Sequence, residues 1–332
     1  RMSCFSLDRR AFLQRGACAG LGAALAGGAQ AQTFPSRMVR IITPFPAGSG
    51  PDAALRMVAE QLSQHWKQAV VVDNRPGGNG FIAWAAFQQG AKDGHDLIQF
   101  DSTHITAHPS TYAKLPYEVQ RDLAPLAMLL RTPFFVAVGA RSPWRSLDEL
   151  VLAARDKPGR ISYGSWFNGS PGHLAGLLLQ AQQHVHMLHV PFRDFGQLYT
   201  AVSNQEVDWA MASVATAAPL EQAGRLRFVT LAAAQRDPLY PKVPTTAESP
   251  LTKGFEVSAW AGLFAPAGLP AAQQNAIGAD IRQALAAPGV VQSYRTMGYE
   301  APPLAPAAFG ALIRKETARW ADIIRTAGLK LD

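Results

Sequence analysis

A glycine-containing loop near the start of the chain has the composition of an anion-binding site. It covers residues 43–52 (TPFPAGSGPD), between a short apolar segment and a stretch with apolar residues at helical spacing. Gly48 and Gly50 allow close backbone approach, and Pro51 suits the first helical position, because its missing N–H would have no partner there. Free N–H groups and the helix dipole would then point at one anion. An ordinary strand-to-helix turn is the alternative interpretation.

Two further loops follow predicted strands. Residues 101–104 (DSTH) come after an apolar strand at 97–100, and residues 164–172 (GSWFNGSPG) come after a strand at 161–163 and before a helix at 173–183. Ligands of open α/β sheets bind at the carboxyl ends of strands, where such loops converge. The sequence therefore predicts a binding site built from residues 44–52, 101–104 and 165–170.

Other chemistry receives less support from the sequence. His184, His186 and His189 could suggest a metal site, but no carboxylate or thiolate lies close enough in sequence to complete a tetrahedral shell. His173 follows Ser170 as a base might follow a nucleophile, yet there is no G-x-S-x-G elbow and no acidic third member. The glycines at 77–80 lack the spacing of a dinucleotide or phosphate loop. We therefore predict no catalytic residue, no metal and no cofactor.

The first 31 residues have the pattern of an export signal. Residues 8–14 (DRRAFLQ) match a twin-arginine motif, and a run of small apolar residues at 16–29 precedes an A-x-A site at 29–31. The run is too short and too rich in Ala and Gly for a stable membrane span. We expect cleavage after Ala31 and a periplasmic location.

Removal of this leader changes the composition of the chain. Cys4 and Cys18 both lie in the leader, so the remaining chain has no thiol and no disulfide. The formal net charge falls from +7 to +4, because the leader carries four arginines and one aspartate. The remaining basic residues are scattered and no nucleic-acid motif occurs, which argues against a nucleic-acid partner. The length suits a soluble protein of two lobes.

Predicted strands and helices alternate along the chain, which favours the α/β class with parallel sheets flanked by helices. An apolar run at 134–138 enters a second unit, and residues 255–264 return from it. Apolar residues from Phe309 to Ile324 mark an amphipathic C-terminal helix that would complete the first lobe.

Several short segments, in order and at matching spacing, resemble one family over essentially the whole length after the leader. They are residues 44–52 (PFPAGSGPD), 72–77 (VDNRPG), 93–94 (DG), 112–117 (YAKLPY), 169–174 (GSPGHL), 189–192 (HVPF) and 255–260 (FEVSAW). The family is the tripartite tricarboxylate transporter type of extracytoplasmic solute receptor, often called Bug proteins.

The resemblance implies a two-lobed periplasmic-binding-protein fold of type II, each lobe a mainly parallel sheet flanked by helices. Lobe 1 would contain residues 32–135 and 257–332, lobe 2 would contain residues 136–256, and two crossing segments would join them. It also implies a monomer that captures a small carboxylate-bearing solute between the lobes and delivers it to integral membrane transporter subunits. A periplasmic sensor for a signalling receptor is the alternative function, and an enzyme of the same architecture is a third.

The resemblance also assigns site residues. Phe45 would form an apolar wall, Ala47, Gly48 and Ser49 would donate hydrogen bonds, and Asp52 would orient the loop rather than touch the anion. The remaining candidates lie in the other two loops and the helix that follows them: Asp101, Ser102, Thr103, Ser165, Trp166, Phe167, Asn168, Gly169, Ser170 and His173.

Three segments depart from the family pattern. Trp166 and Phe167 stand where relatives have small residues, and they either stack on a flat or aromatic solute or cover the lobe interface. Asp101 lies in a loop that is usually rich in Gly, Thr and Ser, and it either pairs with an amine of the solute or caps a helix. Met211 and Ala212 replace a Phe-Asp pair.

Overall fold

The computed structural model of this protein describes residues 34–331. The predicted export signal and its cleavage site lie outside these residues. Residues 37–331 belong to one compact unit. No helix within residues 34–331 has both the length and the apolar character that crossing a bilayer requires.

The first sheet has the strand order β2-β1-β3-β10-β4. β1 pairs in parallel with β2 and β3, whereas β10 is antiparallel to both β3 and β4. Four strands therefore run in one direction and β10 runs in the other. The bounds are β1 Val39–Thr43, β2 Val70–Asn74, β3 Asp96–Asp101, β4 Leu123–Pro133 and β10 Ser258–Pro266. We call this sheet and the helices packed on it lobe 1.

The second sheet repeats this pattern with the order β7-β6-β8-β5-β9. β6 is parallel to β7 and β8, and β5 is antiparallel to β8 and β9. The bounds are β5 Phe135–Gly139, β6 Ser162–Ser165, β7 Leu188–Pro191, β8 Trp209–Ala212 and β9 Leu226–Leu231. This sheet and its helices form lobe 2. The predicted class, two mainly parallel sheets flanked by helices, is confirmed, and the antiparallel strand of each sheet is the first one after the chain crosses between the lobes.

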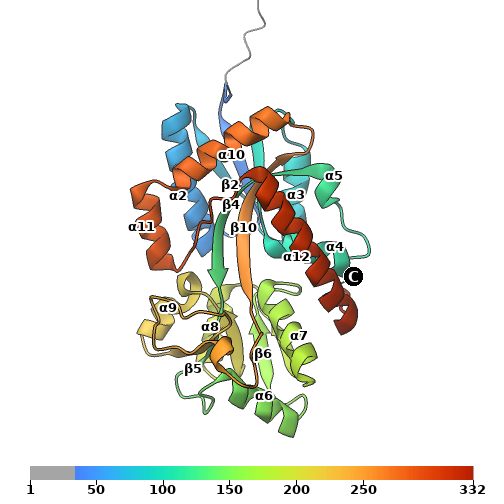
Figure 1. The fold of residues 1–332 in the computed structure, drawn as a ribbon, viewed down its shortest axis with the longest axis vertical. Helices are drawn as coiled ribbons and strands as arrows, with labels where there is room; N and C mark the ends of the chain where they lie inside the picture. The colour runs from blue at the N-terminus through green and yellow to red at the C-terminus, as the bar shows by residue number, and fades with distance from the viewer. Residues whose placement is uncertain (1–33, 332) are drawn as a thin grey trace, which may run out of the picture. The chain divides into compact units, whose positions relative to one another are not determined.

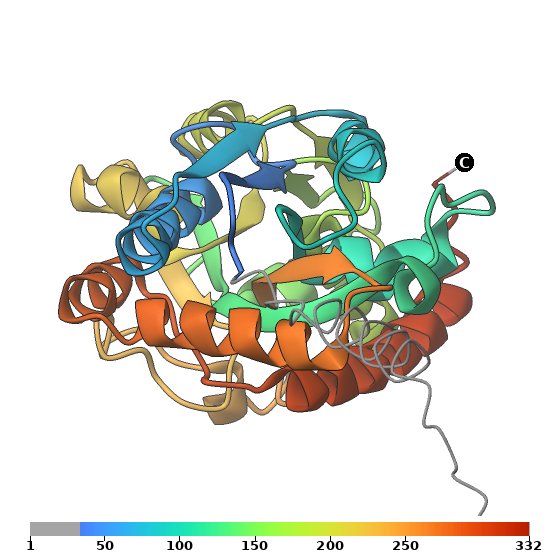
Figure 2. The ribbon, with the colours of Figure 1, turned by 90° about the horizontal axis from the view of Figure 1, so that it is seen from above.

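Helices cover both sheets. α2 has a buried stripe of apolar residues at intervals of three and four, which explains why it packs against the sheet. α10 and α12 lie along the same side of the first sheet, and both contact β4 (Figure 2). The lobe 1 helices are α2 Gly50–Trp66, η1 Gly78–Gly80, α3 Phe81–Gln88, η2 Thr103–Ala107, α4 His108–Thr111, α5 Val119–Asp122, α10 Ala271–Leu285, α11 Pro288–Met297 and α12 Pro306–Ala327. The lobe 2 helices are α6 Leu147–Asp156, α7 Pro171–Gln183, α8 Phe195–Ser203, α9 Val214–Gln222 and η3 Thr246–Glu248.

Two segments of chain cross between the lobes side by side (Figure 1). β4 ends at Pro133 and β5 begins at Phe135, so Phe134 lies between the two sheets. Its N–H donates to the carbonyl of Val257 on the returning segment at 3.2 Å, and its own carbonyl accepts from Ala232 of lobe 2 at 2.8 Å. Phe135, which the predicted boundary puts at the end of lobe 1, is fully buried in the core of lobe 2.

The end of the chain forms a third link between the lobes. Ile324 of α12 packs in one apolar cluster with Ala107 of lobe 1 and Leu174 on α7 of lobe 2. Beyond α12, the N–H of Leu331 donates to the carbonyl of Thr111 at 3.0 Å. We call this cluster of Ala107, Leu174 and Ile324 the C-terminal link.

Candidate functional site

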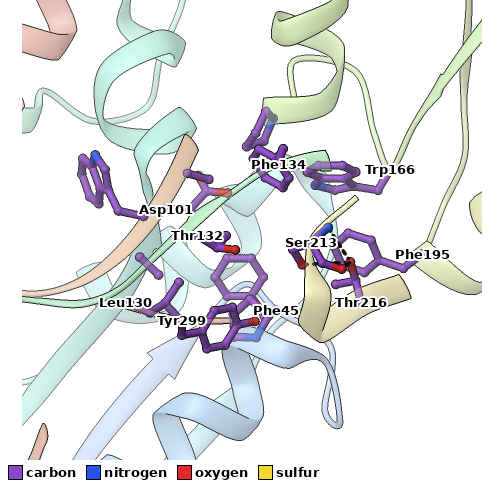
Figure 3. Close-up of a pocket in the computed structure, with 15 residues that line it drawn as sticks. Phe45, Asp101, Leu130, Thr132, Phe134, Trp166, Phe195, Ser213, Thr216 and Tyr299 are labelled. Carbon is purple, nitrogen blue, oxygen red and sulfur yellow. Dashed lines mark hydrogen bonds between the residues drawn. The ribbon is translucent and has the colours of Figure 1, made fainter. Parts of the chain in front are cut away.

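A cavity lies between the two lobes, at the ends of strands from both sheets (Figure 3). The space inside it that a water-sized sphere can reach is about 50 Å³, and part of the cavity opens to solvent. Its lining residues are Phe45, Pro51, Asp101, Leu130, Thr132, Phe134, Trp166, Pro171, Phe195, Ser213, Thr216, Ala259, Trp260, Ala261 and Tyr299.

The N-termini of three helices meet at this cavity. Pro51 is the second residue of α2, Pro171 is the first residue of α7, and Ser213 precedes α9. In α9 the side chains of Ser213 and Thr216 cap the first turn. The N-cap residue of α2, Ser49, makes no such capping bond, and its Oγ is buried without a hydrogen-bond partner among residues 34–331. The first turn of α2 therefore keeps free donors for an anion.

Aromatic rings from both lobes form part of the cavity wall. Phe45, Trp260 and Tyr299 belong to lobe 1, and Trp166 and Phe195 belong to lobe 2. The Trp166 ring lies 5.0 Å from that of Phe195 and 5.7 Å from that of Phe134, measured between centroids. Such a wall favours a flat apolar solute.

The Tyr299 side chain brings a hydroxyl to the start of α2. Its Oη lies directly against Gly50, where a Cβ would overlap it. Burial raises the pKa of Tyr299 well above its usual value, so the phenol stays neutral and can donate. This hydroxyl makes no hydrogen bond to another residue within 34–331. The same holds for the indole Nε1 of Trp166 on the opposite lobe. Both groups can therefore donate to a solute.

Asp101, at the end of β3, is paired with a histidine. His104 brings its Nδ1 to 2.5 Å from Asp101 Oδ1, and its backbone N–H donates to the same oxygen at 3.0 Å. Burial alone would raise the pKa of Asp101, but the charge and hydrogen bonds of His104 hold it below its usual value. The carboxyl group is therefore ionised.

Asp52 fixes the conformation of the first loop. Its Oδ2 accepts from the backbone N–H of Gly48 at 2.8 Å and from Arg56 at 2.9 Å, and its Oδ1 accepts from Asn74 at 2.7 Å. Burial raises the pKa of Asp52, and these hydrogen bonds outweigh it, so the pKa falls below its usual value. This geometry agrees with the predicted orienting role. The Gly48 amide is engaged inside the loop, and Ala47 is exposed.

The second-lobe loop is also held by internal hydrogen bonds. The backbone N–H of Gly169 donates to Nδ1 of His173 at 2.9 Å, and Ser170 Oγ accepts from the backbone N–H of His173 as a helix cap. The His173 ring stacks on that of His189 at 3.8 Å, and burial lowers the pKa of His173 to about 3 and that of His189 to about 4. Ser165 Oγ donates to the carbonyl of Phe167 and lies 2.8 Å from Nε2 of His189.

Of the predicted site residues, the structure brings Phe45, Asp101 and Trp166 to the cavity wall. The others lie outside the lining: Ala47, Gly48, Ser49, Asp52, Ser102, Thr103, Ser165, Phe167, Asn168, Gly169, Ser170 and His173. Phe167 instead faces the His104 ring at 6.5 Å. Because no solute is bound, the ligand role of these residues stays a prediction.

Sequence reasoning missed several lining residues. Ser213 and Thr216 have the spacing of an N-cap pair directly after β8, and this signal could have identified a third helix N-terminus at the site. Trp260 lies in a segment that the family resemblance includes, but it was not given a role. No local sequence pattern indicates a role for Tyr299, since it follows α11 and reaches the cavity only through the tertiary fold.

The histidines do not assemble a metal site in the described part of the chain. No group of three or more His, Cys, Asp or Glu side chains within residues 34–331 has an arrangement that could hold a metal ion.

Two α/β sheets joined by paired crossing segments, with a cavity between them, define the class of two-lobed solute-binding proteins. The model of the tripartite tricarboxylate transporter family receptor matches residues 54–329. The chain belongs to this family, whose members are extracytoplasmic solute-binding receptors.

Individual relatives cover nearly the whole chain. The UPF0065 protein in the tcbD-tcbE intergenic region of Pseudomonas sp. (strain P51) is 35% identical over 88% of this chain and 86% of its own. The Rhodopseudomonas palustris protein Rpa4515, solved with adipate, has a TM-score of 0.82 and 27% identity, and the match covers 90% of this chain and 99% of that chain. MatC from Rhodopseudomonas palustris, with bound malate, has a TM-score of 0.79 and 28% identity, covering 88% and 100%.

Proposed function

We propose that this protein is a periplasmic receptor that captures a small carboxylic acid between its lobes and delivers it to a membrane transporter of the tripartite tricarboxylate type. The observation that carries the proposal is the cavity between the lobes, where the N-termini of three helices meet a wall of aromatic rings. Adipate and malate in the two structural relatives support an organic acid as the solute.

Neutral donors would hold the solute carboxylate in this proposal. No Lys or Arg is among the lining residues of the described chain. Three of these donors belong to lobe 1, at the start of α2: the first turn of the helix, the unpartnered hydroxyl of Ser49 and the hydroxyl of Tyr299. Trp166 Nε1 belongs to lobe 2. A hydrogen bond to a charged group contributes about 1.5–3 kcal/mol, so three of them could support micromolar binding after the cost of closing the lobes.

Closure of the lobes would report binding to the transporter. A solute that touches both lobes stabilises the closed arrangement and shifts the equilibrium toward it. We propose that the lobes divide near residues 135 and 257, that the receptor acts as a monomer, and that it returns its solute unchanged. The leader would be cleaved after Ala31 on export.

A thermal-shift screen followed by calorimetry tests the proposal. The panel holds aliphatic mono- and dicarboxylates, aromatic acids and amino acids, each paired with its amide. A bound acid should raise the melting temperature by mass action, and the neutral amide should not. The proposal is wrong if no acid of the panel binds, or if a bound acid is recovered as a different compound.

Variants at the donors locate the carboxylate. Tyr299→Phe and Ser49→Ala should each weaken the binding of the best acid by about tenfold, because each removes one hydrogen bond to a charged group. Thr317→Ala, on the outer part of α12, is the matched control that removes a hydroxyl away from the cavity. Unchanged affinity in both site variants would place the carboxylate elsewhere.

A further inference from the structure

Asp101 is the single charged residue among those that line the cavity in the described part of the chain. It lies at the carboxyl end of β3, and only 6% of its surface is exposed. A carboxylate at this position has to be explained, because a receptor for acids has no evident use for a second negative charge beside its solute.

The two oxygens of Asp101 differ in their partners. Oδ1 accepts from both the ring and the backbone of His104, as an ordinary helix cap would. Oδ2 has no hydrogen bond from any residue within 34–331. Oδ2 is not one of the buried atoms without a partner, so it keeps some contact with water. A solute that displaces this water leaves an ionised oxygen without a donor, unless the solute supplies one.

The surroundings of Asp101 determine which solute could do so. The neighbouring walls are apolar or aromatic, and the hydroxyl of Thr132 already donates to the carbonyl of Pro133 at 3.2 Å. Tyr299, which marks the proposed carboxylate position at the start of α2, comes from a different segment of lobe 1 (Figure 3). The cavity therefore has an acceptor on one wall and donors on another.

We propose that the solute is an aromatic acid that carries a hydroxyl or amino group, and that this group donates a hydrogen bond to Oδ2 of Asp101. The proposal rests on the proposed function and adds the class of solute. The free oxygen of Asp101 would favour an acid that has a donor over an acid that lacks one.

Calorimetry with matched ligands tests the proposal on the unmodified protein. The probes are benzoate, the 3- and 4-hydroxybenzoates, the 3- and 4-aminobenzoates, and the corresponding methoxybenzoates, which keep the oxygen and the ring but lose the donor. At least one hydroxy or amino acid should bind about tenfold tighter than its methoxy partner and than benzoate. Equal affinities across the set would overturn the proposal.

A variant assigns the preference to Asp101. Asp101→Asn keeps the shape of the side chain and removes its charge, so the preference for the donor-bearing acid should fall to within about twofold. Asp73→Asn, on β2 and outside the cavity, is the matched control and should leave the preference unchanged. If Asp101→Asn does not fold, the comparison of ligands on the unmodified protein still tests the proposal.

The outcomes separate this inference from the proposed function. If benzoate and the methoxy acids bind best, the inference is wrong and the receptor function stands. If only aliphatic acids such as adipate bind, the inference is also wrong, and the receptor function again stands. If no acid binds, both proposals are wrong.

Discussion

Gly50 is a position where one added carbon atom should weaken solute binding. It is the first residue of α2 in lobe 1, and it faces α9 of lobe 2. A Cβ built there would overlap Oη of Tyr299 and lie 3.2 Å from Cβ of Ala215. Tyr299 is itself buried against Tyr294, so it has little room to withdraw.

The cost of Gly50→Ala follows from this geometry. Inserting a carbon into a packed region costs about 1–3 kcal/mol. Gly50 does not require a left-handed backbone, so alanine causes no backbone strain here. The overlap with Tyr299 lies within lobe 1, so it displaces the Tyr299 hydroxyl whether the lobes are open or closed, whereas the contact with Ala215 of lobe 2 opposes closure. Both effects weaken solute binding. At about 1.4 kcal/mol per factor of ten, affinity should fall between about 5-fold and 150-fold.

Two measurements check this prediction. Calorimetry gives the affinity for the best acid, and small-angle scattering gives the change in radius of gyration on adding it. Gly50→Ala should bind more weakly and contract less than the unmodified protein, and its melting temperature without solute should also fall, because the overlap with Tyr299 lies within lobe 1. Gly289→Ala on α11 is the control, because a Cβ there meets open space. If Gly50→Ala binds and contracts as the unmodified protein does, the lobes do not close through this contact.

Three further predictions concern stability and the aromatic wall. Asp52→Ala removes the acceptor of three hydrogen bonds and should lower the free energy of unfolding by about 2–4 kcal/mol, measured by urea denaturation. Burial lowers the pKa of three histidines, to about 3 for His108 and His173 and to about 4 for His189. These rings stay neutral in the fold, whereas a histidine of the unfolded chain takes up a proton below a pKa of about 6.5. Stability should therefore fall as the pH drops from 6.5 toward 4, by up to about 1.4 kcal/mol per unit for each histidine, and a flat profile of urea midpoints would contradict this. Trp166→Phe keeps a ring but removes Nε1–H and should weaken acid binding by about tenfold, whereas Phe167→Leu outside the cavity should change it little.

The sequence predicted the fold well, because the signals for it are local. A short run that is mostly apolar, followed by an amphipathic helix, defines β1 with α2. Glycine loops mark this junction and the junction between β6 and α7. The direction of β5 and β10 had no local signal. It depends on the chain crossing between the lobes, which only the assembled topology shows.

The candidate site was only partly predictable for a related reason. Residues such as Phe45 and Trp166 lie in loops with recognisable composition, and both reach the cavity. The glycine amides in those loops are engaged with Asp52 and His173, and no sequence pattern shows how such groups pair. Tyr299 arrives from a segment about 250 residues away from the loop that it touches, so its role depends entirely on tertiary structure.

The C-terminal link has a consequence for the kinetics of solute entry. Opening the lobes would expose Ala107, Leu174 and Ile324 to water, and this burial favours the closed arrangement even in the empty receptor. Less of the binding energy is then used for closure, which raises affinity, but a solute can enter only during brief openings. Because affinity rises while the association rate falls, the dissociation rate must fall further, so this helix slows both the entry and the release of the solute.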